Sequence, residues 1–264
     1  MAEDILIRER AGAVMRLVLN SPGTLNALSD EMLAALSSAF NEIGADTTIR
    51  AVVIAAQGKA FSAGHDLKQM QAHRNAADGG RGYYDDLFTR CSAVMQKIPA
   101  LPQPVIAEVH GIATAAGCQL AASCDMVVAA EGTRFGVNGI NLGLFCSTPA
   151  VALARAVPRK QAFEMAATGE FIDAARAREI GLVNRVVPPE ALSDEAMALA
   201  QVVAAKLGGA MQIGKQGFYA QIGQPLDVAY QVAGAVMVDN MLEPDTAEGI
   251  QAFIEKRKPD WPQD

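Results

Sequence analysis

Three short and mainly apolar runs, of which the first is unbroken, constrain the fold of this chain more than any other feature. They are AVVIAA at residues 51–56, PVIAEVHG at residues 104–111 and DMVVAAE at residues 125–131. Because polar and apolar residues do not alternate in these runs, each is expected to form a strand covered on both faces, as in a parallel sheet. Helix-like segments separate the runs. This alternation predicts an α/β fold with right-handed crossovers.

The segments around these runs extend the pattern. A hairpin is predicted at the start, with strands at residues 4–9 and 14–19 on either side of Ala11-Gly12. Ser29 stands where a helix cap is expected, and apolar residues follow it at helical spacing up to Gly44: Met32, Leu33, Leu36, Phe40 and Ile43. The rest of the chain predicts helices with short breaks at 149–181, a strand at 182–187, and helices near 194–206, 225–241 and 246–256.

The composition indicates a packed protein that needs neither a metal nor a disulfide. A chain of 264 residues buries most of its apolar surface. Its four cysteines lack the paired spacing of zinc sites, and three of them, Cys91, Cys118 and Cys124, lie among apolar or small residues, where buried thiols are usual. Cys146 lies in the loop-like stretch LGLFCSTP, where an exposed nucleophilic thiol is the alternative to a buried one.

The net charge and the first ten residues indicate which partners and which cellular compartment to expect. A net charge of −7 argues against a sequence-independent nucleic-acid binder. A membrane-spanning helix is not predicted either, because the sequence contains no apolar run of about 18 residues. The first ten residues, MAEDILIRER, carry early acids and lack the apolar centre of a signal peptide. These features predict a cytoplasmic protein without nucleic-acid or membrane partners. The matrix of an organelle, reached after cleavage of a leader, is the alternative.

Two stretches rich in small residues are the candidates for chemistry. GKAFSAGHDLK at residues 58–68 leaves a strand and turns towards a helix, and HGIATAAGCQLAASCD at residues 110–125 passes from strand to helix. If the second helix begins near Ala116, its first N–H groups have no partner within the helix and can hold an oxyanion. Turns of this kind also serve close packing of a helix on a sheet, so spacing alone leaves a structural role open.

These stretches resemble the enoyl-CoA hydratase and isomerase family, the crotonase superfamily. The resemblance covers nearly the whole chain, because further matching motifs follow in order: LNSPGTLNALSDEM at 19–32, FGVNGINLG at 135–143, TGEFIDAARAREIGLVNRVV at 168–187 and the terminal FIEKRK. It implies a spiral of ββα repeats over residues 1–200, followed at 201–264 by helices that build trimers or pairs of trimers. The set is specific for the fold and less so for the reaction.

The resemblance also implies a binding site for an acyl-coenzyme A substrate. Its oxyanion donors would be the backbone N–H groups of His65 and Ala116. The residues expected around coenzyme A are Ala27, Ala63, Asp66, Leu67 and Lys68, with Lys68 near a phosphate. No metal and no cofactor is implied, since coenzyme A is part of the substrate.

The pattern breaks at the two glutamates that hydratases of this family use as general acid and base. Gln119 and Gly139 stand at those positions. Gln119 becomes the polar group expected at the reacting carbon, and Gly139 and Cys146 are expected in the substrate pocket. Three functions remain open: a hydratase-like enzyme with altered chemistry, an acyl-CoA decarboxylase or thioester hydrolase, and a non-catalytic acyl-CoA-binding protein.

Overall fold

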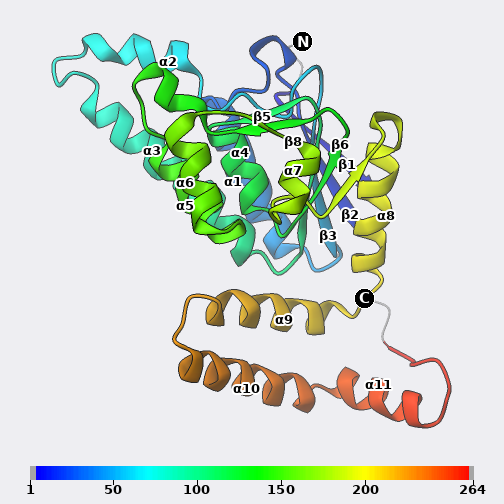
Figure 1. Ribbon diagram of the computed structural model, residues 1–264. Coiled ribbons are helices and arrows are strands. Elements are labelled where there is room, and N and C mark those ends of the chain that lie inside the picture. The colour runs from blue at the N-terminus through cyan, green and yellow to red at the C-terminus, as the bar shows by residue number, and fades with distance from the viewer. Residues whose placement is uncertain (1–3, 262–264) are drawn as a thin grey trace.

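The computed structural model describes residues 4–261 and has a six-stranded sheet at its centre (Figure 1). The strand order is β1 (Leu6–Ala11), β2 (Val14–Leu19), β3 (Ala51–Ala56), β4 (Val105–Val109), β6 (Met126–Ala130) and β9 (Arg185–Val187). β1 and β2 form the predicted antiparallel hairpin, and the later neighbours all pair in parallel. The predicted α/β fold is confirmed.

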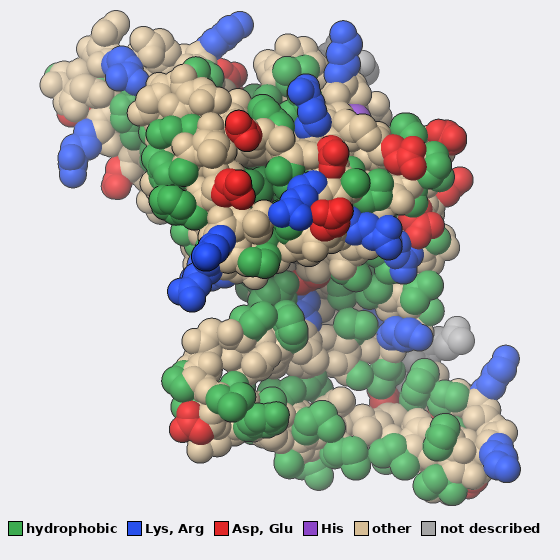
Figure 2. All heavy atoms as spheres, in the orientation of Figure 1, with side chains coloured by type: hydrophobic (Ala, Val, Ile, Leu, Met, Phe, Trp, Pro, Cys, Tyr) green, Lys and Arg blue, Asp and Glu red, His purple; other side chains and the backbone are tan. Residues whose placement is uncertain are grey.

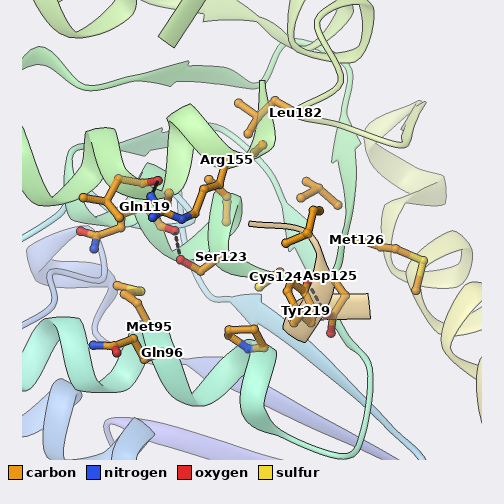
Figure 3. Close-up of a pocket in the computed structure, with 18 of the residues that line it drawn as sticks. Met95, Gln96, Gln119, Ser123, Cys124, Asp125, Met126, Arg155, Leu182 and Tyr219 are labelled. Atoms are coloured by element: carbon orange, nitrogen blue, oxygen red, sulfur yellow. Dashed lines mark hydrogen bonds between the residues drawn. The ribbon is translucent and has the colours of Figure 1, made fainter. Parts of the chain in front are cut away.

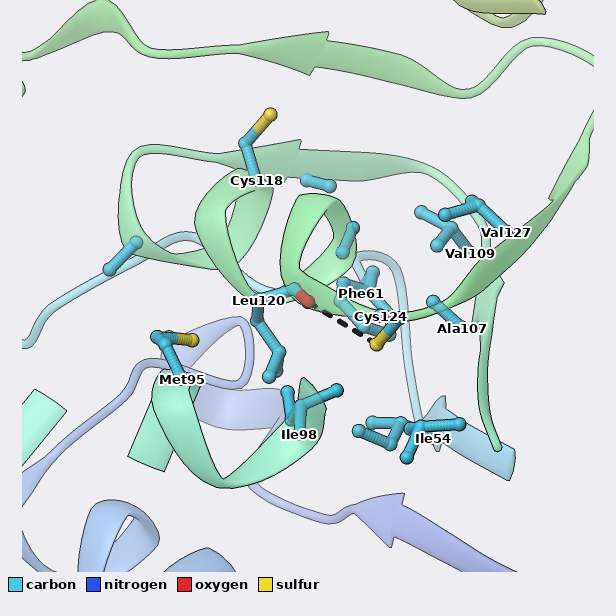
Figure 4. Packing of buried hydrophobic residues seen from close by; sticks show 14 of the residues in the cluster. Ile54, Phe61, Met95, Ile98, Ala107, Val109, Cys118, Leu120, Cys124 and Val127 are labelled. Carbon is cyan, nitrogen blue, oxygen red and sulfur yellow. Dashed lines mark hydrogen bonds between the residues drawn. The ribbon is translucent and has the colours of Figure 1, made fainter. Parts of the chain in front are cut away.

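Both faces of the main sheet are covered, which explains the unbroken apolar runs. In β3, Val52 and Ile54 pack into the large core on one face, while Ala51 and Val53 join a second cluster on the other. Residues of α8 (Leu192–Ala204) complete the second cluster. Figure 4 shows Ile54 in the large core, which also contains Phe61, Leu120 and Val127.

The first long helix, α1 (Asp30–Ala45), lies on the face of the large core. Its cap is the predicted Ser29, whose hydroxyl accepts the N–H of Met32 at 3.2 Å. The apolar residues that predicted this helix are buried on one side of it: Met32, Leu33, Leu36, Phe40 and Ile43.

A smaller sheet gives the fold its spiral form. Its strands are β5 (Ile112–Thr114), β7 (Arg134–Gly136) and β8 (Ile172–Asp173). The chain passes from the main sheet to the small one and then into a helix, first as β4, β5 and α4 (Ala116–Ser123), then as β6, β7 and α5 (Ser147–Ala156). Ser62, after β3, bridges Ala113 in parallel, so the preceding turn has the same form.

The remaining helices complete the body and extend beyond it. The body also contains α2 (Leu67–Ala72), α3 (Arg81–Ala100), α6 (Arg159–Thr168) and α7 (Ala174–Glu179). Past α8, a separate layer in Figure 1 is formed by α9 (Gly208–Gln221), α10 (Leu226–Leu242) and α11 (Pro244–Ile254). The sequence pattern predicted α10 and α11 but not α9.

No single helix within residues 4–261 is long and apolar enough to cross a membrane. Residues 189–204 and α9 meet the length and composition of a span only when taken together, and the chain bends by 103° between them.

Gly117, in the first turn of α4, lies directly against the loop that follows β3. A Cβ atom at this position would come within 2.3 Å of the Ser62 carbonyl oxygen and 2.7 Å of the Ser62 Cβ. The helix can approach the loop this closely only because residue 117 has no side chain.

Gly117→Ala should therefore destabilise the protein by roughly 1–3 kcal/mol, since the added methyl group must push α4 away from Ser62. Gly214→Ala in α9 is the matched control, because no described atom lies within 4 Å of a Cβ placed there. Alanine in a helix interior is favoured over glycine by roughly 0.5–1 kcal/mol, so the control should be neutral or stabilising. Urea titration measures both, and equal effects would contradict the close approach.

Candidate active site

Two backbone segments, one following β3 and one following β5, lie side by side at the end of the sheets. The Ser62 N–H donates to the Ile112 oxygen at 3.2 Å, and the Thr114 N–H donates to the Ser62 oxygen at 3.0 Å. Two residues further on, a Cβ atom on Gly64 would lie 3.1 Å from the Ala116 nitrogen. The structure therefore brings the neighbourhood of His65 and the start of α4 together.

The backbone N–H groups of His65 and Ala116 are both unpaired within residues 4–261. Ala116 is the first residue of α4, where an N–H has no partner inside the helix and lies at the positive end of the helix dipole. His65 follows Gly64, which turns the chain with a φ of +88°. Two such donors can hold an oxygen atom that gains negative charge.

Ala115, immediately before α4, has a strained backbone that sequence reasoning did not identify. Its φ is 49° and its ψ is −122°, a combination that costs a residue with a side chain roughly 1–3 kcal/mol. The conformation is held from both sides, because the Ala115 N–H donates to the Gly136 oxygen and its oxygen accepts the Gln119 N–H, both at 3.0 Å. An alanine gives no signal of this strain in the sequence.

The His65 imidazole turns away from α4 towards α1 and α3. Its Nδ1 lies 3.3 Å from the Leu28 oxygen, and the ring packs edge-on against Phe88 with centroids 5.7 Å apart. Burial lowers the pKa of His65 below its usual value, so the ring is neutral at pH 7. With the proton on Nδ1 for Leu28, Nε2 is a buried acceptor without a partner among the described residues. The ring thus anchors the segment that carries the unpaired His65 N–H.

The residues expected around coenzyme A lie on the loop after β3, at the start of α2 and on the neighbouring segment before α1. Ala63 donates its N–H to the Leu25 oxygen at 3.0 Å, and Ala27 is buried beside Leu28, whose N–H donates to the Gly64 oxygen at 2.7 Å. Asp66 caps α2 by accepting the N–H groups of Lys68 and Gln69 at 2.8 and 3.2 Å. Leu67 and Lys68 are exposed on the first turn of α2.

Asn26 is a positioning residue that sequence reasoning missed. Its backbone has a φ of 53°, which asparagine tolerates better than most residues. The fully buried side chain accepts the Ser21 N–H at 2.8 Å and donates to the oxygens of Gln57 and Ala60 at 2.7 and 2.8 Å. It therefore ties the loop before α1 to the loop after β3. A polar asparagine between Leu25 and Ala27 was the available signal.

Gln119 lies one turn beyond Ala116 and is almost completely buried, with 4% of its surface exposed. Its Oε1 atom has no hydrogen-bond partner among the described residues. Gln119 also lines a cavity of about 660 Å³ between α3, α4, α5 and α9. Figure 3 shows it there with Met95 and Gln96 of α3, Ser123 of α4, Arg155 of α5 and Tyr219 of α9. A buried, unpaired amide at the wall of a cavity indicates a place for a ligand.

Gly139 has no room for a side chain. It begins the tight turn at residues 138–142, and a Cβ atom on it would lie 2.5 Å from the Leu144 oxygen and 2.7 Å from the Cys146 Sγ. The backbone itself fills the space from which a second carboxylate would project. A carboxylate side chain at position 139 would therefore collide with this turn.

Cys146 is not the exposed thiol that its loop-like surroundings allowed. Only 7% of its surface is exposed, and burial raises the pKa of the thiol, which keeps it protonated at neutral pH. The prediction of buried thiols at the other three positions, Cys91, Cys118 and Cys124, is confirmed. Cys146 therefore lies beside Gly139 as a neutral group.

Solved structures of other proteins share this fold. An enoyl-CoA hydratase from Mycobacterium smegmatis superimposes with a TM-score of 0.94 at 54% identity, covering 98% of this chain and 99% of its own. Human enoyl-CoA hydratase domain-containing protein 3 gives a TM-score of 0.92 at 44% identity, covering 98% of this chain and all of its own. The predicted crotonase-like spiral is confirmed.

Sequence relatives correct the predicted location. A rat protein named enoyl-CoA hydratase domain-containing protein 3, mitochondrial, is 46% identical over 94% of this chain and 81% of its own length. Frog and human relatives carry the same mitochondrial name. These names contradict the prediction of a cytoplasmic protein. The reasoning failed because the composition of ten residues does not report a compartment.

The model of one protein family matches almost the entire chain. It is described as enoyl-CoA hydratase/isomerase and matches residues 9–264. This match includes the loop after β3, the start of α4 and the turn that contains Gly139. The chain belongs to the enoyl-CoA hydratase/isomerase family.

Proposed function

We propose that this protein binds an acyl-coenzyme A thioester and stabilises the enolate-like oxyanion of its carbonyl between the N–H groups of His65 and Ala116. One observation carries the proposal: two unpaired backbone N–H groups lie on neighbouring segments, where Gly64 packs against the first residue of α4. A preorganised donor of this kind is commonly worth about 3 kcal/mol in the transition state. Family membership supports a thioester as the source of the carbonyl.

Coenzyme A is proposed to lie along the loop formed by Ala27, Ala63, Asp66, Leu67 and Lys68. Small residues at positions 27 and 63 allow a ligand to approach the main chain. The exposed Lys68 would supply a positive charge to a phosphate. Asp66 holds this loop in place through its two hydrogen bonds to α2.

The nearest reaction label is enoyl-CoA hydratase, with Gln119 as the polar group at the reacting carbon. An amide can hold a water molecule but cannot accept its proton. A second candidate, decarboxylation or thioester hydrolysis, is favoured by the blocked position at Gly139. Decarboxylation leaves an enolate that two N–H donors can stabilise without a strong protein base. A non-catalytic acyl-CoA-binding protein is the third outcome.

Incubation with crotonyl-CoA, and separately with carboxyacyl-CoA and saturated acyl-CoA thioesters, distinguishes these functions when products are identified by mass. We expect binding of all three classes and turnover of at least one. Addition of water to crotonyl-CoA identifies a hydratase. Loss of carbon dioxide or release of free coenzyme A identifies the second candidate. No binding of any thioester would contradict the proposal.

Gln119→Ala should lower turnover about 100-fold and change the dissociation constant for the thioester much less. The reason is that a group acting on the reacting carbon contributes in the transition state rather than to coenzyme A binding. Gln201→Ala, on the exposed surface of α8, is the matched control and should change neither quantity. Steady-state kinetics and titration calorimetry measure the two. Equal losses in turnover and affinity would show that Gln119 only binds.

Gly139→Glu should not create hydratase activity, because its side chain meets the Leu144 carbonyl, and it should destabilise the protein by roughly 1–3 kcal/mol. Gln119→Glu is the comparison, since position 119 already holds a side chain of the same length. A well-placed acid or base is typically worth about 10²- to 10⁴-fold, so this variant should hydrate crotonyl-CoA faster. If adding Gly139→Glu to the Gln119→Glu variant greatly increased the rate of crotonyl-CoA hydration, the conclusion that position 139 is blocked would be contradicted.

The layer of α9, α10 and α11 is proposed to build trimers or pairs of trimers. Its large apolar side chains are exposed, including Leu226 at 74%, Leu242 at 77% and Phe253 at 84%. Figure 2 shows hydrophobic side chains gathered over these helices. Contiguous apolar surface of this kind marks an interface.

Light scattering at micromolar concentration should give the mass of three or six chains. Leu242→Glu should lower that mass by placing a charge in the buried interface. Phe163→Glu, at an exposed position of α6 in the body, is the control and should leave the mass unchanged. A monomer in the unmodified protein would contradict the proposed assembly.

A further inference from the structure

We propose that the cavity beyond Gln119 receives the far end of the acyl chain, so that this protein acts on thioesters of long apolar acyl groups, with α9 as one wall. This inference rests on the proposed placement of the thioester at His65 and Ala116. The cavity of about 660 Å³ lies within the range of pockets that hold small organic ligands.

The position of Gln119 connects the proposed reaction site to this cavity. Gln119 lies three residues after Ala116 on α4 and lines the cavity, and its Oε1 is buried without a partner among the described residues. Three residues of helix rise about 4.5 Å. An extended zigzag chain advances less than the ~1.5 Å length of each carbon–carbon bond, so about four bonds cover that rise. Acyl groups of about four carbons therefore end near Gln119, and longer ones enter the cavity.

Three polar side chains in the cavity wall form hydrogen bonds to backbone oxygens of their own helices. Ser123 donates to the Gln119 oxygen at 2.8 Å, Gln96 donates to the Ser92 oxygen at 3.2 Å, and Arg155 donates to the Val151 oxygen at 3.1 Å. Each of these donors is used within one helical turn. Ser92, Thr148 and Asn184 also line the cavity. The rest of the lining is largely apolar and includes Met95, Ala122, Val151, Ala152, Leu182 and Phe218. This chemistry fits a hydrocarbon chain.

A buried ionic cluster holds α9 in place as one wall of the cavity. The Lys215 ammonium donates to the oxygens of Ile98 and Gln103 at 2.8 Å each and to the Asp125 carboxylate at 2.7 Å, which uses all three of its protons. Tyr219 donates to the other oxygen of Asp125 at 2.7 Å. Asp125 lies two residues beyond the end of α4. The cluster therefore links the helix that begins at the proposed reaction site to the helix that forms one wall of the cavity. Lys215 and Tyr219 are positioning residues.

Dissociation constants for saturated acyl-CoA thioesters of 2, 4, 6, 8, 10 and 12 carbons test the proposal on the unmodified protein. Affinity should change little up to about four carbons and then rise about two- to fourfold for each methylene that enters the cavity. Acetyl-CoA that binds without any gain from longer chains would overturn the cavity proposal alone. Failure of acetyl-CoA to bind would instead overturn the proposed function.

A matched pair of substitutions on α5 tests whether the acyl chain of decanoyl-CoA binds in this cavity. Ala152→Phe fills the cavity and should weaken decanoyl-CoA binding at least tenfold while acetyl-CoA binding stays within twofold. Ala154→Phe adds the same group at an exposed position outside the cavity and should change neither. Equal effects of the two variants on decanoyl-CoA would overturn the proposed location.

Tyr219→Phe keeps the ring in the wall and removes only its hydrogen bond to Asp125. It should weaken decanoyl-CoA binding about three- to tenfold and leave acetyl-CoA binding unchanged. Tyr230→Phe, exposed on α10, is the control. An unchanged ratio of the two affinities would overturn the positioning role of the cluster.

Discussion

The close approach of two backbone segments controls the whole site. Parallel strands place the loops that follow them at one end of the sheets, and the spiral repeats this for β3 and β5. Glycine at 64 and 117 then allows the loop after β3 to lie against the first turn of α4 without side chains between them. The large core under both segments, which includes Phe61, Ala113 and Leu120, fixes their separation. The chemistry offered by the site follows from main-chain atoms.

A site built from backbone donors tolerates changes in the side chains around it. His65 can carry an imidazole because the ring turns away towards Leu28 and Phe88, while its N–H faces the site. The resemblance places the two hydratase glutamates at positions 119 and 139. Gln119 keeps a polar group at the first, and the turn at Gly139 leaves no space for a side chain at the second. The strained backbone of Ala115 and the unpaired amide of Gln119 both lower the stability of the protein. In the proposed function, both would contribute to binding the thioester.

The sequence predicted most of what depends on local patterns. The apolar runs of β3, β4 and β6, the Ser29 cap and the start of α4 at Ala116 were all readable, because burial on two faces and helical spacing leave direct traces. The helix α9 was not, since four of its residues, Gly208, Gly209, Gly214 and Gly217, disfavour a helix. Contacts distant in sequence, above all Lys215 with Asp125, hold it instead. The burial of Cys146 and the blocked space at Gly139 likewise depend on how a turn folds back on itself.

A crystal structure with bound acetoacetyl-CoA is the most direct test of the oxyanion site. We expect the thioester oxygen to lie about 3 Å from both the His65 and the Ala116 backbone nitrogens, the usual length of such hydrogen bonds. A thioester oxygen bound to a side chain, or distant from either nitrogen, would contradict a site made from these two backbone donors.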